Sequence, residues 1–413
     1  MGLSLSTREL QLPTDFDLTA HLPKNALSYI RGGQGLVGVG ESLRLSASGP
    51  NRMQVLAAQW RSLVLDSSVD DQVNLPGTGL VAFGSFAFAD GSESESVLIV
   101  PQALLGVRDG RAWLTVVDGA SVEDFWSKPA AYDRNPAVQF AAGQQTAAEF
   151  KLAVADAVSA IGAGTVEKVV LARDLVGQLP QYFDIRPVLA KLASKYPTCW
   201  VYSVAGLFGA SPELLVRVAH GQVSARVLAG TAGRGTDPGV DAAIASALVA
   251  SEKNLVEHAF AVDSLVQALE PFCTKVDADT KPFSLALPNL WHLASDVHGV
   301  LRGDASVLDL AAALHPTAAV AGTPRAAAQS LLAELEGFDR GRYAGPVGWI
   351  GADGDGEWAI ALRGAQIETV AAAQFETQQV RAFAGCGIVA GSDPEAELAE
   401  TELKFQPIRD ALS

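Results

Sequence analysis

The chain has few cysteines and fewer basic than acidic residues, and each shortage excludes a class of protein. Its 413 residues include three cysteines, which lie far apart and show no C-x-x-C spacing. A disulfide-stapled secreted domain and a cysteine zinc site are therefore not expected. Lys and Arg number 30 against 46 Asp and Glu, so the formal net charge is −16. Because no basic run offsets this charge, we expect neither nucleic acid nor an anionic membrane as a partner.

The sequence also lacks a long uninterrupted apolar run. Its most alanine-rich apolar region, residues 310–324, is broken by His315, Pro316 and Gly322 and is too short to span a bilayer. The first residues, MGLSLSTRELQLPTDF, show no basic start followed by an apolar stretch, so a signal peptide is not expected. These features predict a cytoplasmic location.

The chain contains enough apolar residues to form a large core. It is 49% hydrophobic and 18% charged, which is typical of a folded protein. Length alone predicts roughly two or three domains. The segment 127–145, with Pro129, Pro136 and Gly143, is the best candidate for a connection between two halves. Strand patterns often follow strand patterns, which favours a mixed α+β architecture with packed sheets over a regular βαβ series.

Local signals predict several helices and strands. Thr146 and Glu149 have the spacing of a capping box at the start of a helix that ends near Gly162. Other helices are expected over 252–269 and 395–405. Strands are expected over 168–175, 207–218, 357–367 and 380–384.

The helix expected over 252–269 carries one carboxylate away from its apolar stripe. The stripe consists of Leu255, Ala259, Val262, Val266 and Leu269. Glu257 falls on the opposite side, with Lys253, Ala261 and Ser264. The pattern alone favours a solvated face for Glu257, and a binding role stays open.

The last helix has a charged face. Ser392 and Glu395 predict a capping box at its start. Glu397, Glu400 and Lys404 then project from one face. They are either an exposed ion-paired surface or a carboxylate pair that binds a hard cation beside a lysine that binds an anion.

Further positions carry groups suited to chemistry. Lys168 and Glu213 lie in strand-like segments and could mark a strand's wet side, or act as acid and base if burial disfavours their charged forms. Arg363, predicted to share a face with Ala359 and Ala361, suits either a surface or a bound carboxylate. Gly385 and Gly387 precede the last helix, in a tight turn or where backbone N–H groups approach an anion.

The order and the amino-acid sequences of these segments resemble those of one family. The chain contains the blocks EKVVLARDL, FGASPELLVRV, VLAGTAGRG, SEKNLVEHAF, LWHLASDVHG, LHPTAAVAGTP, GRYAGPVGWIGADGDGEWAIALRGAQI and AGCGIVAGSDPEAELAETELKFQPI. They resemble the chorismate-using enzymes, which include isochorismate, salicylate, anthranilate and aminodeoxychorismate synthases. The likeness is dense from Thr146 onward and looser before it, chiefly in SYIRGGQGLVGVGE.

The resemblance implies a fold and a ligand set. The family fold is one large α/β (α+β) unit with two packed, mainly antiparallel sheets flanked by helices. Residues 1–413 would form this unit, with 1–142 contributing to the sheets and 143–413 forming the chorismate-binding core. By similarity, Glu257 and Glu400 bind Mg²⁺ and Glu397 supports the site. Tyr343, Arg363, Lys404 and the backbone at Gly385 and Gly387 would bind carboxylate, and Gly230, Thr231 and His292 would line the ring. Asn254 departs from the family, which more often has Asp or Glu there.

The resemblance also implies a reaction. Chorismate is a dicarboxylate, so an acidic protein needs Mg²⁺, Arg363 and Lys404 to hold it. Water adds at ring position 2 while the hydroxyl leaves from position 4. Lys168 resembles the base and Glu213 the acid, which requires a neutral lysine and a protonated carboxyl at the start.

Three positions favour an isochorismate synthase within the family. Ala229 stands where amine-forming members have a nucleophilic lysine, ammonia-using members generally lack a lysine at the position of Lys168, and the wording around His292 is similar to isochorismate synthases. Salicylate synthase, which goes on to eliminate pyruvate, is the nearest alternative, and a non-catalytic binding protein is a remote one. We expect a monomer without a glutaminase subunit, whose product serves menaquinone, siderophore or salicylate synthesis.

Overall fold

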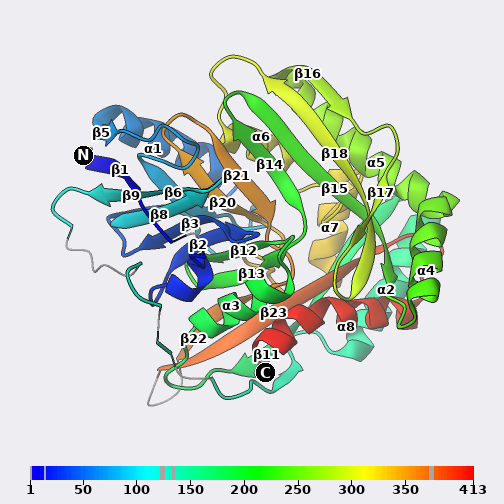
Figure 1. Cartoon of the computed structure of the whole chain (residues 1–413). Coiled ribbons are helices and arrows are strands. Elements are labelled where there is room, and N and C mark those ends of the chain that lie inside the picture. Colours follow the sequence, from blue (N-terminus) through cyan, green and yellow to red (C-terminus); the bar gives the residue numbers. More distant parts are fainter. Residues whose placement is uncertain (1, 14, 121–125, 130, 133–134, 372–375) are drawn as a thin grey trace.

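Two large sheets flanked by helices make up the computed structural model of the chain (Figure 1). It describes residues 2–13, 15–120, 126–129, 131–132, 135–371 and 376–413, without the side chains of Lys253, Glu257, Val370, Ala371 and Glu376. The strand pairs in these ranges are antiparallel, apart from one parallel pair at the edge of the larger sheet. The predicted mixed α/β class with two packed, mainly antiparallel sheets is confirmed.

In the described ranges the larger sheet has 13 strands. Its order is β10 (Phe140–Ala142), β11 (Lys168–Gln178), β23 (Glu376–Ile388), β22 (Gly364–Ala371), β13 (Leu207–Ser211), β12 (Trp200–Val204), β2 (Leu27–Arg31), β3 (Gln34–Val39), β8 (Ala103–Arg108), β9 (Arg111–Val117), β1 (Ser4–Leu10) and β5 (Ser68–Asp71), with β19 (Gly322–Thr323) paired to β11.

The smaller sheet has 10 strands among the described residues. Its order is β16 (Cys273–Ala278), β18 (Leu290–Leu301), β15 (Gln222–Gly233), β14 (Leu214–Ala219), β21 (Gly356–Ile360), β20 (Pro346–Gly351), β6 (Val81–Ser85), β7 (Ser96–Val100) and β4 (Leu43–Ala47), with β17 (Phe283–Ala286) paired to β18. Both sheets therefore combine strands from before residue 143 with strands from after it.

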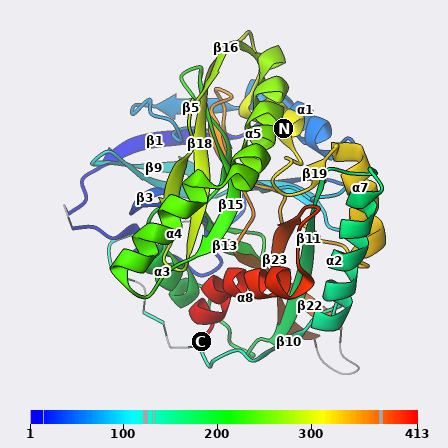
Figure 2. The ribbon, with the colours of Figure 1, turned by 90° about the vertical axis from the view of Figure 1, so that its right-hand side faces the viewer.

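Helices cover the outer face of each sheet (Figures 1 and 2). The smaller sheet carries α1 (Arg52–Asp66), α4 (Pro238–Ala250), α5 (Glu252–Leu269) and α6 (Val307–Leu314). The larger sheet carries α2 (Ala147–Gly162), α3 (Arg186–Lys195), α7 (Arg325–Leu335) and α8 (Pro394–Ala411). Short 3-10 turns occur at η1 (Leu18–His21) and η2 (Glu270–Phe272). None of the helices in the described part of the chain is long and apolar enough to cross a bilayer.

Large aromatic side chains fill the space between the sheets. Trp113 and Tyr202 of the larger sheet and Phe83 of the smaller sheet are fully buried in one cluster with Trp349. The strands β6, β12 and β20 are buried at every position, so both faces of each of these strands are covered.

Two predicted strands are each split between the sheets. The prediction over 207–218 is wrong at its middle, because β13 ends at Ser211 in the larger sheet and β14 starts at Leu214 in the smaller one. The prediction over 357–367 is wrong in the same way, because the chain leaves β21 after Ile360 and enters β22 at Gly364. Hydrophobic alternation does not distinguish one long strand from two strands in different sheets.

The helix signals were more accurate. The capping box at Thr146 is confirmed, and α5 has the predicted bounds. The box at Ser392 is wrong, because Asp393 is the N-cap and its side chain accepts from the N–H of Ala396 at 2.9 Å. Glu395 instead pairs with Lys151, with 2.7 Å between the charged atoms. The last helix also continues past 405, with Pro407 inside it.

Candidate active site

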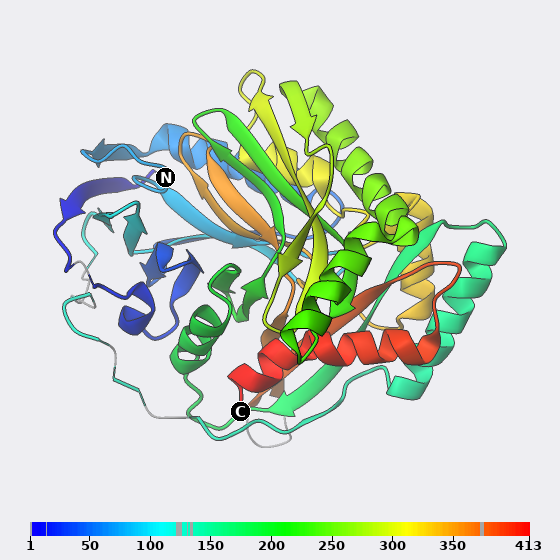
Figure 3. The ribbon, with the colours of Figure 1, turned by 45° about the vertical axis from the view of Figure 1, so that its right-hand side comes forward.

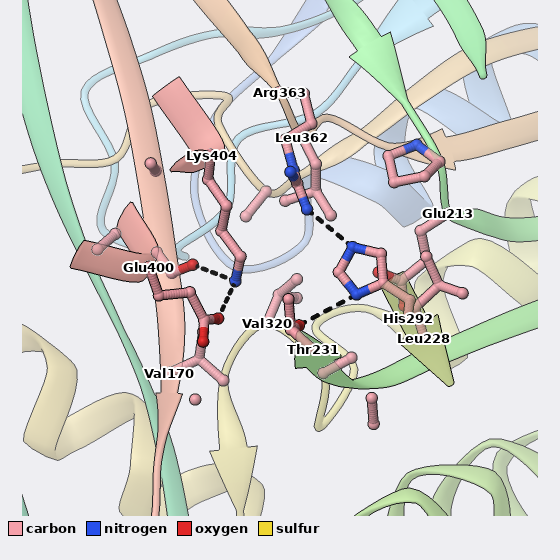
Figure 4. A pocket seen from close by; sticks show the side chains of 18 of the residues that line it. Val170, Glu213, Leu228, Thr231, His292, Val320, Leu362, Arg363, Glu400 and Lys404 are labelled. Atoms are coloured by element: carbon pink, nitrogen blue, oxygen red, sulfur yellow. Dashed lines mark hydrogen bonds and ion pairs between the residues drawn. The ribbon is translucent and has the colours of Figure 1, made fainter. Parts of the chain in front are cut away.

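The residues selected from the sequence gather around one cavity of about 200 Å³. It lies between α8, the strands β11 and β23, the two links between the sheets, and the paired strands β15 and β18 (Figure 4). Figure 3 shows how these helices and strands are arranged. Its lining includes Lys168, Glu213, Gly230, Thr231, His292, Tyr343, Arg363, Gly385, Gly387, Glu397, Glu400 and Lys404. Glu257 is the remaining selected residue, and its side chain lies outside the described residues.

Lys168 is the first residue of β11 and is buried, with 9% of its surface exposed. Side chains alternate along a strand, so Lys168, Val170 and Ala172 project to the same side. All three line the cavity. The lysine therefore faces the cavity and not a solvated surface.

Glu213 lies in the link between β13 and β14 and is 5% exposed. Its backbone is held on both sides, because its N–H donates to Ser211 Oγ at 3.2 Å and its carbonyl accepts from the N–H of Ile360 at 3.1 Å. Burial raises the pKa of the Glu213 carboxyl to about 7, against a hydrogen bond from the Leu228 backbone and the charges of Lys168, Arg363 and Lys404. Near neutral pH this carboxyl can both hold and release a proton.

Arg363 lies in the other link, with a left-handed φ of 50°. Its Nη2 is 3.0 Å from Nε2 of His292, and its Nη1 is buried without a hydrogen-bond partner among the residues that the structure describes (Figure 4). Strained backbone of this kind persists where surrounding structure fixes it, often at functional sites. The free Nη1 is a donor available to a bound anion.

His292 can be assigned one tautomer. Arginine is only a donor, so Nε2 of His292 must accept. Burial, with the charges of Arg363 and Lys404, lowers the pKa of His292 well below its usual value, against a hydrogen bond to the Gly230 backbone. The ring is therefore neutral and carries its proton on Nδ1, which lies 3.1 Å from Oγ1 of Thr231. Because that oxygen accepts, the Thr231 hydroxyl hydrogen can turn toward a ligand.

The charged face of α8 closes the cavity. Nζ of Lys404 donates to the carbonyl of Gly385 at 2.7 Å and pairs with Oε1 of Glu400 at 2.7 Å. Arg173 of β11 holds the helix in place, since its Nε donates to Thr401 at 2.8 Å and its guanidinium pairs with Glu402.

The two glycines do not form a turn before α8. Gly385 and Gly387 are inside β23, opposite Ala172 and Val170 of β11. A Cβ on Gly385 would lie 2.7 Å from the carbonyl oxygen of Leu171, so a larger residue would push the two strands apart. The turn interpretation is wrong, because glycine here permits close packing of strands.

The carboxylates of α8 have the chemistry of a cation site. Burial raises the pKa of Glu397, the charge of Glu400 raises it further, and a hydrogen bond with Ser392 opposes both. Two adjacent half-buried carboxylates repel each other, and a hard cation with oxygen preference would relieve this. No group of three or more His, Cys, Asp or Glu side chains suits a metal among those described, which exclude that of Glu257.

The helix that carries Glu257 lies against the cavity. Asn254, one turn before it, lines the cavity, and Ala261, one turn after it, is buried. The predicted stripe is displaced, because Ala259 is exposed while Leu265 is buried. The side of α5 that the sequence pattern predicted to be exposed therefore includes buried positions.

Sequence reasoning missed part of the cavity wall. Arg340 lines the cavity and pairs with Glu336, and both side chains are buried. An i, i+4 Glu–Arg pair at the end of a helix was the available signal, but it is usually a surface feature. Tyr343, which was selected, stacks on Phe383 with ring centroids 5.0 Å apart, and burial raises its pKa to about 12.

Comparisons with known proteins identify the family of the chain. A family model described as chorismate binding enzyme matches residues 24–413. The chain is 38% identical over 277 residues to isochorismate synthase DhbC of Bacillus subtilis, covering 64% of this chain and 67% of that protein. It is 31% identical over 408 residues to isochorismate synthase MenF of the same organism, covering 91% and 85%.

A solved structure shares the fold. The menaquinone-specific isochorismate synthase MenF of Escherichia coli superposes with a TM-score of 0.78 at 22% identity, covering 100% of this chain and 95% of that chain. The family model covers most of the sequence, two relatives match over most of their length, and the selected residues surround one cavity. The chain belongs to the chorismate-binding enzyme family.

Proposed function

We propose that the chain is an isochorismate synthase that interconverts chorismate and isochorismate with Mg²⁺. The observation that carries this is the pairing of a buried carboxyl with a pKa of about 7, Glu213, and a buried lysine, Lys168, in one cavity. Relatives named isochorismate synthases support the assignment.

The cavity has cationic groups for a dianionic substrate. The formal net charge of −16 repels a dicarboxylate at long range. Inside the cavity, Arg363 offers its free Nη1 and Lys404 offers a charge now shared with Glu400. These donors suit one carboxylate of chorismate, and the ring would lie against Gly230, Thr231 and His292.

The carboxylates supply the proposed metal ligands. Glu257, Glu397 and Glu400 would hold Mg²⁺, whose charge, when bound, would stabilise electron density that moves toward the ring carboxylate. Binding a cation would also release Lys404 from Glu400 and free its ammonium for the substrate.

The residues then divide the proton transfers. Lys168 removes a proton from the water that adds at ring carbon 2, and Glu213 gives a proton to the hydroxyl that leaves carbon 4 as water. The two ring double bonds each shift by one position, so one water enters and one leaves. The reverse reaction uses the same groups with their roles exchanged, and solvent restores both protonation states.

Other family reactions fit less well. Ala229 lines the cavity where amine-forming relatives have a nucleophilic lysine, so a covalent lysine adduct has no nucleophile at that position. We also propose, from the resemblance to isochorismate synthases, that the enzyme acts as a monomer without a glutaminase subunit.

Product analysis tests the function. The purified chain with chorismate and Mg²⁺ should form isochorismate without pyruvate, and pure isochorismate should return to the same ratio. Salicylate and pyruvate as main products would move the assignment to salicylate synthase. A product that requires ammonia would contradict both.

A further inference from the structure

Part of one edge of β11 is completed by side chains in place of a paired strand. On the edge away from β23, β11 pairs with β19 at Lys168 and Val169 and with β10 from Leu175 onward. Between these points no strand pairs with this edge in the described ranges. There the N–H of Val170 donates to the carbonyl of Ala321 at 2.9 Å, while the other partners are side chains. The carbonyl of Val170 accepts from Nη2 of Arg340 at 2.6 Å, and the N–H of Ala172 donates to Oε1 of Glu336 at 2.7 Å.

Glu336 and Arg340 form a buried ion pair with several hydrogen bonds to the backbone. Their side chains are 4% and 3% exposed. Nε of Arg340 donates to Oε2 of Glu336 at 2.8 Å, and Nη1 donates to the carbonyl of Val320 at 2.9 Å. The guanidinium also lies 4.4 Å from the ring centre of Phe88. A planar fork with fixed donors can hold these groups in one relative geometry, which a single ammonium cannot.

The groups held by this pair belong to the cavity wall. Val170, Ala172 and Val320 line the cavity, and Lys168 precedes Val170 by two residues on the same side of β11. A shift of β11 at Val170 would therefore move Lys168 relative to Glu213, which is held separately by Ser211 and Ile360.

We propose that Glu336 and Arg340 are positioning residues that hold β11 so that Lys168 is aligned for proton transfer. This rests on the proposed function, because the alignment matters only if Lys168 acts on substrate. The pair contacts β11 and the 320 segment through backbone groups, so its effect reaches the reaction through strand position.

Substitutions can separate this role from plain stability. Arg340→Lys keeps the charge but loses the fork. The double variant Glu336→Gln/Arg340→Met removes both charges, so no buried charge is left unpaired, and replacing a buried ion pair in this way is often tolerated. The amide oxygen at position 336 of this variant can still accept from Ala172, while Val170 loses its donor. The matched control is Asp184→Asn/Arg186→Met, which removes a similarly enclosed ion pair away from the cavity.

Steady-state kinetics on the intact chain, below the unfolding midpoint of every variant, provide the test. We expect both Arg340 variants to lose about 10- to 100-fold in kcat with KM changed less than about threefold, and the control to keep its kcat within about twofold. Backbone hydrogen exchange over residues 168–174 should be faster in Arg340→Lys than in wild type. This measurement does not depend on enzyme activity.

The outcomes are distinct. A stable double variant with kcat within about threefold of wild type, or unchanged exchange over 168–174, would overturn the inference. A wild-type chain that makes no isochorismate would instead overturn the proposed function. If the double variant does not fold, the Arg340→Lys kinetics and exchange decide.

Discussion

Glu213 and Arg363 occupy neighbouring links at which the chain passes from one sheet to the other. β13 pairs with β22 in the larger sheet, and β14 pairs with β21 in the smaller sheet. The carbonyl of Glu213 accepts from Ile360, and the carbonyl of Arg363 accepts from Ala210 at 3.2 Å. The link that contains Glu213 is thus bonded to β21, which leads into the link of Arg363, and the link that contains Arg363 is bonded to β13, which leads into the link of Glu213. The proposed acid, Glu213, and the proposed carboxylate-binding cation, Arg363, therefore share a rigid support, which catalysis by precise positioning requires.

The first prediction concerns Glu213. Glu213→Gln should lose roughly 100- to 10,000-fold in turnover, because the amide keeps the shape but cannot deliver a proton. KM should change far less. Stopped-time product assays at saturating chorismate measure this, and near-normal turnover would leave Glu213 as a structural residue.

The same group should set the alkaline side of the pH profile. With a pKa of about 7, Glu213 loses its proton as pH rises through neutrality, so kcat/KM should fall on that side.

The raised pKa of Glu213 should also affect stability. The folded form binds more protons than the unfolded form, so the free energy of unfolding falls as pH rises from the ordinary pKa of a glutamate toward 7. The thermal stability of Glu213→Gln relative to wild type should therefore be higher at pH 8 than at pH 5. A difference that is equal at both pH values would contradict the shift.

Lys168, the proposed base, should not be replaceable by arginine. Lys168→Ala should lose roughly 100- to 10,000-fold in turnover, and Lys168→Arg should not rescue it, because arginine does not release its proton. Lys195→Ala, an ion-paired residue of α3 outside the cavity, is the control and should remain active. Wild-type turnover in Lys168→Ala would require another base.

Magnesium dependence should follow the carboxylates. Glu257→Gln, Glu397→Gln and Glu400→Gln should each raise the Mg²⁺ concentration for half-maximal activity by at least about tenfold, and calorimetric Mg²⁺ binding should weaken in parallel. Glu395→Gln, on the same helix but paired with Lys151, should not change it. Unchanged Mg²⁺ binding in Glu257→Gln would place that residue on a solvated face.

Arg363 should act mainly through substrate affinity. Arg363→Lys cannot both donate to His292 and reach a carboxylate with a second fork nitrogen, so KM should rise by about tenfold or more. Turnover at saturation should fall less. An unchanged KM would indicate that the free Nη1 does not face the substrate.

The sequence predicted most elements but not how they divide between the sheets. The helix at Glu252 and the capping box at Thr146 depend on local periodicity and hydrogen bonding, which sequence records directly. The splits at Glu213 and Arg363 depend on which sheet each half joins, and alternation is the same in either case. Resemblance, not pattern, selected these residues for the site.

Long-range partners explain the rest. The pairing of Ala172 with Glu336 joins residues 164 positions apart, and no local pattern encodes it. Likewise Gly385 is required because of Leu171 on the adjacent strand. The sequence shows only a glycine before a helix, which fits a turn or an anion-binding backbone equally well.

The most direct test of the central claim follows the oxygen atom. When chorismate is converted in ¹⁸O-labelled water with Mg²⁺, mass spectrometry of the isochorismate formed at early times should find one label, in the new hydroxyl group. This is the result expected if Lys168 activates water and Glu213 expels the original hydroxyl. Unlabelled isochorismate would show that the hydroxyl migrates within the substrate, and the assigned roles of both residues would then be wrong.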